Sequence, residues 1–502
     1  MSAGSRNAGA EGVELLEAAL VAPELADRME LVLRRTDPET YRATAVDGSV
    51  TFRRVAEGGV WRYDELEVTG RHPLADQATD RFLGHDAELG NRFPHRTANA
   101  YPHAYDSVAQ FFDGPHAPDL LATHTPAHHL DGNVGQHGSL GAVQARAPFL
   151  AAGCGIRPLG TLDRATRMVN VAPTLAALLG VEPHPAGIGP TGEARADALL
   201  ARQDGDVEVE LLNGETPDHV VVFLLDGCNA NLLAEVMSIG EAPNLAALRD
   251  GGTMYGHGMV ASLPTATLAN HNCALTGAHP GHTGVLHHAW YDRTRDATVD
   301  LLRLEQMFWA SEHLDPSVET LFSALARSRP HAFSTATFEY CDVGADLSSF
   351  AMARSGEATE LPPLEAVTRL TEAPDVCTEK YRFMSRVDHL SVGHTLQAWR
   401  QEHNNPLPTL SWCSLALTDE AGHEAGPHSP AARASVRDSD ARVGDVLTAV
   451  DAAGVRDRTA VVVLADHGME TSDTALSATW EAELAATGVP HLEVGGGLIY
   501  LT

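Results

Sequence analysis

The chain has 502 residues, 44% of them hydrophobic, and a formal net charge of −32 at pH 7. This length and composition suit a globular protein with one large α/β domain and insertions, or with two or three ordinary domains. The acidic surface should repel nucleic-acid backbones, so no nucleic-acid polymer is expected as a partner. The six cysteines lack CxxC pairs and the density of a disulfide scaffold.

The start of the chain, MSAGSRNAGAEGVELLEAAL, lacks the basic region followed by an apolar stretch that marks a signal peptide. No run of about 18 apolar residues occurs that could cross a membrane. We therefore expect a cytoplasmic protein without a membrane partner, and we expect residues 1–12 to be disordered.

Apolar patterning predicts strands and helices that alternate along the chain. In chain order we expect a helix at 13–20, a Pro- and Gly-rich linker or partly helical connector at 182–217, a strand at 220–225, a helix at 318–327, a strand at 410–417, a helix at 432–453, a strand at 461–464 and a strand at 492–501. The alternation predicts the α/β class, with a largely parallel central sheet sandwiched by helices.

Three of these strands stop at an aspartate. Asp226 follows the first, Asp419 the second and Asp466 the third. Ligands of parallel sheets gather at the carboxyl ends of the strands, so the three side chains are expected to converge. Each aspartate taken singly could equally be a helix N-cap.

Histidines accompany these aspartates in short motifs. The motif LTDEAGH places His423 four residues after Asp419, LADHGME places His467 beside Asp466, and GQHGSL contains His137. Carboxylate and imidazole together suit zinc or a similar divalent ion. With 26 histidines in the chain, each motif alone could arise by chance.

A hydroxyl lies just ahead of a predicted helix in PTATLANH, at Thr267. A divalent cation would favour its alkoxide, and a helix N-terminus would favour a bound phosphate. Alternatively, Thr265 or Thr267 could simply be an N-cap.

Together, the segments FLLDG, APNLAAL, PTATLANHNCALTG, HTGVL, TDEAGHEAGP and VVVLADHGME resemble the alkaline phosphatase superfamily. Within it, the type I phosphodiesterase/nucleotide pyrophosphatase branch is the most similar. The resemblance implies two divalent metal ions, zinc being the expected element. One would be held by Asp226, Asp466, His467 and the nucleophile Thr267, and the other by Asp419, His423 and a further histidine.

In the family the last histidine lies downstream in a GxHG segment, and here that segment is at the front, at His137. We therefore expect a circular permutation, in which residues 13–181 complete the catalytic domain formed mainly by residues 218–502. Residues 182–217 would link the two, and residues 492–501 should lie beside residues 13–20. Otherwise His137 would belong to a separate domain and the second metal would lack its imidazole.

Two further residues are substrate-binding candidates. His288 stands where nucleotide pyrophosphatases carry an asparagine that holds a phosphate oxygen, and Asn270 lies in the threonine motif. A surface or structural histidine is an equal alternative for His288.

These residues predict a metal-dependent hydrolase of phosphate esters, of the phosphodiesterase or nucleotide pyrophosphatase type, that forms a covalent phosphothreonine on Thr267. Its partner would be a small phosphate ester or a nucleotide. The same motifs also serve phosphonoacetate hydrolases and phosphomonoesterases, because the pocket walls decide the substrate. An alternative of another class is a noncatalytic metal-binding protein that keeps the scaffold.

Overall fold

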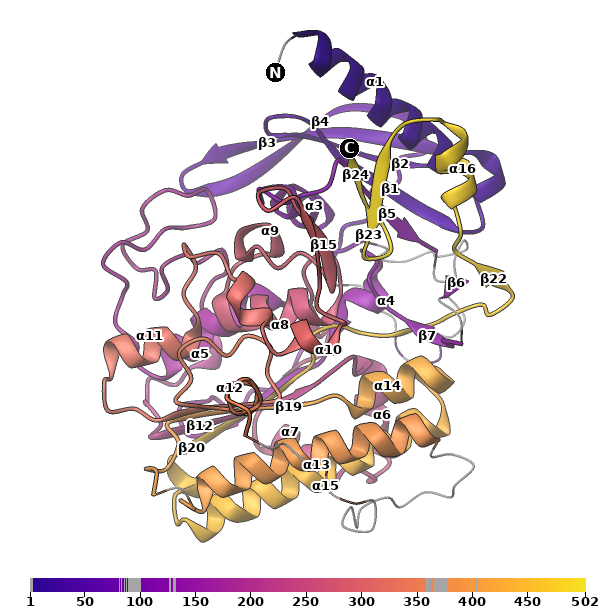
Figure 1. Ribbon diagram of the computed structural model, residues 1–502. Coiled ribbons are helices and arrows are strands. Elements are labelled where there is room, and N and C mark those ends of the chain that lie inside the picture. Colours follow the sequence, from indigo (N-terminus) through magenta and orange to yellow (C-terminus); the bar gives the residue numbers. More distant parts are fainter. Residues whose placement is uncertain are drawn as a thin grey trace.

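The computed structural model describes residues 3–80, 101–125, 132–357, 378–402 and 404–502, together with residues 82, 84, 86, 88, 128, 129, 361 and 363. Two large sheets lie one above the other in the view of Figure 1, and helices cover the lower one. The lower sheet is central to the site described below.

This central sheet has eight strands, and β9 runs antiparallel to both of its neighbours while the other strands share one direction. In spatial order they are β10 (Gly160–Leu162), β13 (Thr253–Tyr255), β9 (Phe149–Gly153), β20 (Thr459–Leu464), β12 (His219–Leu225), β19 (Leu410–Leu415), β17 (Ser334–Thr337) and β18 (Leu347–Ser348). The expected parallel sheet is therefore present within a mixed one.

The middle strands are apolar throughout because both of their faces are covered. Every residue of β12, β19 and β20 is buried. The strand expected at 410–417 is shorter than predicted, since helix α14 (Leu417–Ala425) begins two residues after β19 ends. Asp419 consequently lies in the first turn of a helix.

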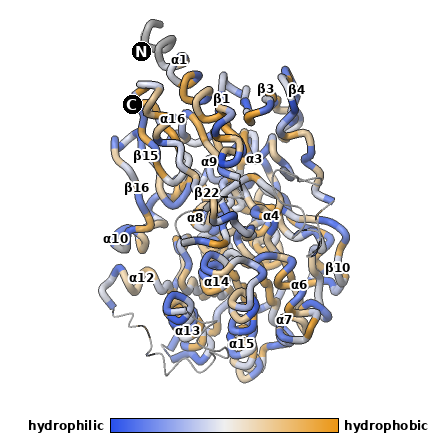
Figure 2. The backbone as a smooth tube through the Cα atoms, turned by 90° about the vertical axis from the view of Figure 1, so that its right-hand side faces the viewer, coloured by the Kyte–Doolittle hydropathy of each residue, from blue (hydrophilic) through white to orange (hydrophobic). Residues whose placement is uncertain are grey.

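Helices pack on both faces of the central sheet (Figure 1). They are α5 (Val171–Leu178), α6 (Ala230–Ser238), α7 (Pro243–Gly251), α8 (Thr267–Thr276), α11 (Leu321–Ser328), α13 (Glu379–Trp399) and α15 (Pro430–Ala452). The helices expected at 318–327 and 432–453 correspond to α11 and α15. Each begins at a hydroxyl N-cap, Thr320 or Ser429. Figure 2 views α13 and α15 nearly end-on, and many of their residues are coloured as hydrophilic.

The second sheet has seven strands and is antiparallel throughout, so the expected largely parallel sheet describes only the central part of the fold. Its spatial order is β23 (His491–Val494), β24 (Leu498–Leu501), β5 (Leu120–His124), β1 (Met29–Asp37), β2 (Thr40–Ala45), β3 (Gly48–Glu57) and β4 (Val60–Gly70). The antiparallel pairing of β3 with β4 has a local cause. Gly58 and Gly59 both adopt positive φ and close a two-residue hairpin between these strands.

The two ends of the chain meet at the top of Figure 1. Strand β24 pairs with β5, and helix α1 (Ala3–Leu20) packs against α16 (Glu481–Ala486) and β24. Leu16, Leu20 and Ile499 belong to one buried cluster. Helix α1 begins at Ala3, within the segment 1–12 that the sequence predicts to be disordered. Alanine-rich sequence favours helix, and the later turns of α1 bury leucines.

Residues 182–217 form an irregular segment with one 3₁₀ turn, η3 (Val209–Leu211). The segment is packed against the domain: Gln203 is fully buried, Asp204 accepts a hydrogen bond from the His279 backbone, and Leu200 lies in the main core. It therefore connects its flanking segments as ordered structure.

The remaining helical elements are η1 (Pro23–Leu25), α3 (Ala104–Phe111), α4 (Ala142–Ala145), η2 (Met168–Asn170), α9 (Pro280–Thr283), α10 (Leu304–Met307), η4 (Ala310–His313), α12 (Ser349–Arg354) and η6 (Arg456–Arg458). The remaining strands are β6 (His128–His129), β7 (Gly135–Gln136), β8 (Arg146–Ala147), β11 (Thr166–Arg167), β14 (Met259–Val260), β15 (Ala289–Asp292), β16 (Ala297–Asp300), β21 (Glu470–Thr471) and β22 (Leu476–Ser477).

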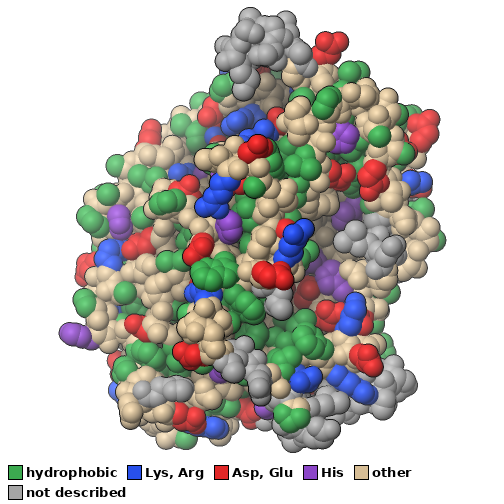
Figure 3. Space-filling view, in the orientation of Figure 1, with side chains coloured by type: hydrophobic (Ala, Val, Ile, Leu, Met, Phe, Trp, Pro, Cys, Tyr) green, Lys and Arg blue, Asp and Glu red, His purple; other side chains and the backbone are tan. Residues whose placement is uncertain are grey.

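Charged side chains of both signs are interspersed over the face drawn in Figure 3. Within the described residues, every helix is too short or too polar to cross a membrane.

Candidate metal centre

The three aspartates meet because their strands are neighbours in the sheet. Strands β20, β12 and β19 are adjacent and parallel, so Asp466, Asp226 and the start of α14 leave the same edge. None of the three side chains caps a helix: α6 is capped by Asn229, and Asp419 lies inside α14. Gly227, with φ +61°, permits the close approach, since a Cβ there would lie 2.4 Å from Asp419 Oδ1.

Thr267 is the first residue of α8 and is almost fully buried at this edge. Its Oγ1 lies 3.4 Å from Asp226 Oδ1 and 3.2 Å from His467 Nε2. The N-cap of α8 is Ala266, and the Thr265 hydroxyl instead donates to the Ser139 carbonyl. Neither threonine is therefore a helix N-cap, and the Thr267 hydroxyl faces the acidic cluster.

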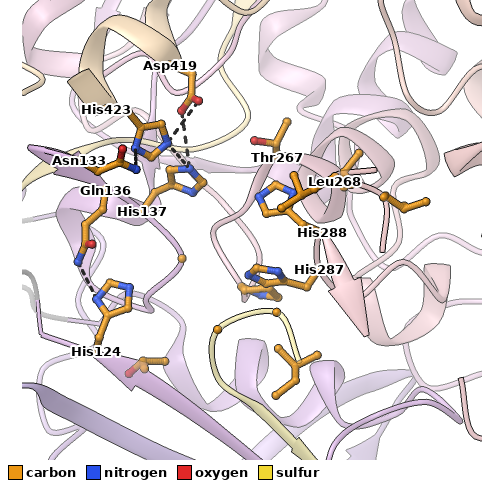
Figure 4. A pocket seen from close by; sticks show the side chains of 18 of the residues that line it. His124, Asn133, Gln136, His137, Thr267, Leu268, His287, His288, Asp419 and His423 are labelled. Atoms are coloured by element: carbon orange, nitrogen blue, oxygen red, sulfur yellow. Dashed lines mark hydrogen bonds and ion pairs between the residues drawn. The ribbon is translucent and has the colours of Figure 1, made fainter. Parts of the chain in front are cut away.

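His137, Asp419 and His423 form a second group beside the first. The Nε2 atoms of the two histidines are 3.1 Å apart, and Asp419 carboxylate oxygens lie 3.7 Å from His137 Nε2 and 3.4 Å from His423 Nε2. Figure 4 shows the three side chains pointing toward one another. The structure thus places the histidine from the front of the chain with the pair from α14.

Backbone carbonyls orient all three site histidines in the same way. The Nδ1–H of His137 donates to Thr265 O at 2.8 Å, that of His423 to Gly135 O at 2.8 Å, and that of His467 to the next residue's carbonyl at 2.9 Å. Each Nε2 lone pair is left facing the cluster. This arrangement of outer hydrogen bonds is typical of metal-ligating histidines.

The electrostatics of the cluster also fit divalent cations. Burial, together with the nearby carboxylates of Asp466 and Asp419, raises the pKa of Asp226 well above its usual range. Burial and the neighbouring His467 and His423 lower the pKa of His137 well below its usual range. Asp419 Oδ1 and Asp466 Oδ2 are buried without a hydrogen-bond partner among the described residues. Oxygen and imidazole donors left unsatisfied in this way suit zinc or a similar ion.

The donor atoms fall into three groups, and within each group all atoms lie within 4.8 Å of one another. The groups are His137, Asp419 and His423; Asp226, Asp419 and His467; and Asp226, His271 and Asp466. All six metal ligands expected from the sequence are therefore brought together around Thr267. His271 is an addition that the sequence analysis did not assign.

His271 and its partner Glu339 were missed because their roles depend on tertiary contacts. The His271 Nδ1 lies 2.9 Å from a Glu339 carboxylate oxygen, and both side chains are buried. One sequence signal was available: His271 follows Thr267 by four residues in a helix, which puts both on one face.

Asn270, expected as a substrate-binding residue, instead holds the backbone ahead of Thr267. Its Oδ1 accepts from Ser262 N at 2.7 Å, and its Nδ2 lies within 3.2 Å of the carbonyls of Ser262, Pro264 and Ala266. The side chain is fully buried and does not line the cavity beside the site. Because its polar atoms are already paired, Asn270 shapes the loop that carries the nucleophile candidate.

His288 lies on the wall of a cavity of about 510 Å³ that is also lined by Asp226, Thr267 and Asp419. Its ring centroid is 6.4 Å from that of His137 and 4.9 Å from that of His287 (Figure 4). Burial and the neighbouring His287 lower the pKa of His288 well below its usual range, so its imidazole is neutral at neutral pH. Apolar side chains complete much of the wall, among them Leu121, Leu301, Met307 and Trp480.

The family model of type I phosphodiesterases/nucleotide pyrophosphatases matches residues 220–495. The chain belongs to this family. The type I phosphodiesterase family lies within the alkaline phosphatase superfamily, as the motifs predicted. The matched range contains Asp226, Thr267, Asp419, His423 and the Asp466–His467 pair, whereas His137 lies outside it.

Two relatives that match the chain individually are distant from it in sequence. Human ectonucleotide pyrophosphatase/phosphodiesterase family member 7 is 35% identical over 79 residues, which are 16% of this chain and 17% of the human protein. Murine ectonucleotide pyrophosphatase/phosphodiesterase 5 has a solved structure that is 19% identical, with a TM-score of 0.36, and the match covers 50% of this chain and 57% of the murine one. An inactive variant of the murine protein in complex with AMP is 18% identical with a TM-score of 0.34. The chain thus spans less than two thirds of each of these relatives.

Proposed function

We propose that this chain is a metal-dependent phosphoric ester hydrolase of the phosphodiesterase/nucleotide pyrophosphatase type, with Thr267 as its nucleophile. The observation that carries the proposal is the position of the Thr267 hydroxyl, 3.2 Å from His467 Nε2 and 3.4 Å from Asp226 Oδ1, at the N-terminus of α8. Family membership supports the same reaction class.

The donor atoms suit two divalent cations, zinc being the ion expected from the mixture of imidazole and carboxylate. Asp226, Asp466 and His467, with Thr267, would hold one, and His137, Asp419 and His423 would hold the other. When bound, the cations would favour the Thr267 alkoxide and neutralise charge on the phosphoryl oxygens.

Thr267 supplies the attacking oxygen. Its Oγ1 forms a bond to phosphorus while the bond from phosphorus to the leaving alcohol breaks, which leaves a phosphothreonine and an alcohol that takes a proton from solvent. Water then attacks the phosphothreonine, the bond between Thr267 Oγ1 and phosphorus breaks, and the phosphate or phosphomonoester is released. The N-terminus of α8 adds favourable potential for the phosphoryl group.

The neutral His288 on the cavity wall would donate a hydrogen bond to a phosphoryl oxygen. In nucleotide pyrophosphatases, which this chain resembles, an asparagine at the matching position holds that oxygen. The alcohol or nucleoside part of the substrate would occupy the apolar cavity that continues past His287 and Trp480. A small phosphate ester or a nucleotide is therefore the proposed substrate class.

A substrate panel tests the proposal. The full chain, loaded with Zn²⁺, should hydrolyse a bis(nitrophenyl) phosphodiester and a nitrophenyl nucleotide ester, and the chelator-treated chain should not. Preference for a nitrophenyl monoester would indicate a phosphomonoesterase, and preference for phosphonoacetate would indicate a phosphonate hydrolase. Metal binding without turnover of any of these compounds would contradict the proposal and favour a noncatalytic metal-binding protein.

We further propose that the domain is circularly permuted, with residues 13–181 completing the part formed by 218–502 and 182–217 linking them. The pairing of β24 with β5, the packing of α1 on α16 and the approach of His137 to His423 support this. A rearranged chain that starts at Glu215, joins Thr502 to Val13 through a short Gly-Ser linker and ends at Gly214 should fold and bind metal as the natural order does. A rearranged chain that folds but has lost the metal affinity would contradict the permutation.

A further inference from the structure

The backbone that leads into Thr267 is tied to the first turns of α8. Ser262 N donates to Asn270 Oδ1 at 2.7 Å, and Asn270 Nδ2 donates in turn to the carbonyls of Ser262, Pro264 and Ala266. Ser262 is 3% exposed and Asn270 is fully buried. A displacement of Ser262 is therefore passed directly to the backbone that carries Thr267.

His279 holds the side chain of Ser262 from outside the metal centre. Its Nδ1 lies 3.0 Å from Ser262 Oγ, and its ring is 2% exposed. On the other edge of the ring, Arg167 Nη2 lies 3.3 Å from Nε2. A guanidinium can only donate, so Nε2 accepts, and the ring proton lies on Nδ1 and is donated to Ser262 Oγ. The Asp106 carboxylate pairs with Arg167 and is 3.8 Å from Nε2, too far for a hydrogen bond.

The backbone of His279 is fixed by the irregular segment 182–217. His279 N donates to Asp204 Oδ2 at 2.8 Å, and Asp204 N donates to the carbonyl of Gly277, which ends α8. Asp204 is 7% exposed. Parts of the chain on both sides of α8 in the fold thus hold one imidazole in place. Burial and Arg167 lower the pKa of His279 to about 4, so this ring is neutral at neutral pH.

Neither Ser262 nor His279 belongs to the groups of metal donors, and neither lines the cavity beside them. Any effect on the reaction passes through the loop that carries the nucleophile. We propose that Ser262 and His279 are positioning residues that fix the Thr267 hydroxyl for attack. The inference rests on the proposed function, because it takes Thr267 as the nucleophile. Displacement of an attacking atom by about 1 Å can cost about 100-fold in rate.

Kinetics of the full, zinc-loaded chain on the bis(nitrophenyl) phosphodiester test the proposal. In Ser262→Ala and in His279→Ala, kcat and kcat/KM should fall together by about 10–100-fold, with KM and zinc content as in the wild type. The double variant should be no slower than the slower single variant, because both changes remove the same hydrogen bond. Ser439→Ala is the matched control with wild-type kcat. Ser439 is equally buried in α15, and its Oγ makes no hydrogen bond among the described residues.

Conservative variants of His279 separate positioning from packing. The amide of asparagine can take the place of Nδ1 and donate to Ser262 Oγ, whereas the amide of glutamine takes the place of Nε2. His279→Asn should therefore regain most of the kcat that His279→Ala loses, and His279→Gln should not.

Wild-type kcat in Ser262→Ala, an effect confined to KM or to zinc content, or losses that multiply in the double variant would overturn the inference. If the His279 variants do not fold, Ser262→Ala decides alone. If the wild type and Ser262→Ala cleave phosphate esters equally fast, the proposed function stands and only this inference fails. If the wild type cleaves none, both fail.

Discussion

The Nε2 atoms of His137 and His423 lie 3.1 Å apart although 286 residues separate them in the chain. Both Nδ1 atoms donate to backbone carbonyls, so two lone pairs face each other across this distance. Such a contact is unfavourable without a proton or a cation between the rings. This relationship is the basis for expecting that metal occupancy dominates both activity and stability.

Replacement of the nucleophile should separate chemistry from metal binding. Thr267→Ala removes the attacking oxygen, so kcat should fall by at least about 1,000-fold. Thr267→Ser keeps a hydroxyl and should retain a measurable part of the activity. Turnover of the bis(nitrophenyl) phosphodiester measures both, and Thr448→Ala, on the outer helix α15, is the control with wild-type activity. Full activity in Thr267→Ala would show that the nucleophile is assigned wrongly.

Removing the imidazole of His137 should weaken one cation selectively. In His137→Ala the Asp419–His423 pair loses a donor, so one zinc ion should bind more than about 100-fold less tightly, beyond the effect usual for an outer partner. Zinc titration followed by calorimetry measures the change. The exposed His331 supplies the control variant His331→Ala. Unchanged zinc affinity in His137→Ala would place His137 outside the metal centre.

Chelation should destabilise the whole domain. Without cations, the buried carboxylates of Asp226 and Asp466 and the partly buried carboxylate of Asp419 repel one another at the edge of the central sheet. A ligand present at 1,000 times its Kd stabilises the folded state by about 4 kcal/mol, so the Tm should fall by several degrees with EDTA and recover on addition of Zn²⁺. Differential scanning fluorimetry measures this. A Tm that is insensitive to EDTA would mean that the cluster folds without bound metal.

Asp388 should make stability depend on pH near neutrality. This fully buried carboxylate of α13 accepts from Ala416 N at 2.7 Å and Leu417 N at 3.3 Å, and so caps the helix that carries Asp419 and His423. The pKa of Asp388 is raised from 3.8 to about 7, chiefly by burial and to a lesser extent by the neighbouring Asp438, against the opposing effects of Arg442 and the two N–H groups.

Between pH 4 and 7 the folded state therefore holds one proton more than the unfolded state at this position. The contribution of Asp388 is present in full below pH 4 and is lost as pH rises toward 7, by up to about 1.4 kcal/mol per pH unit. Asp388→Asn should flatten this slope, measured by urea unfolding at several pH values. Asp451→Asn, at an exposed acid, should leave the slope unchanged. An unchanged slope in Asp388→Asn would mean that Asp388 titrates at its usual pKa.

Local sequence patterns predicted much of the site because its residues follow elements with clear signals. The apolar runs that became β12 and β20 end at Asp226 and just before Asp466, and the four-residue spacing of Asp419 and His423 became one face of α14. The antiparallel sheet was missed because its strands are partly exposed, with short apolar patterns, and β4 is largely exposed. Asn270 was misassigned because a motif does not reveal which carbonyls surround a side chain.

By itself the sequence determined the kinds of donor atom, the hydroxyl ahead of α8 and the strands whose ends carry the aspartates, since side-chain chemistry and apolar periodicity are local properties. Only the tertiary structure decided that β20, β12 and β19 are neighbours, that His137 joins α14, and that His271 turns its Nε2 toward Asp226 and Asp466. Those outcomes depend on strand order and on carbonyls and carboxylates from distant segments, which fix each ring only once the chain has packed.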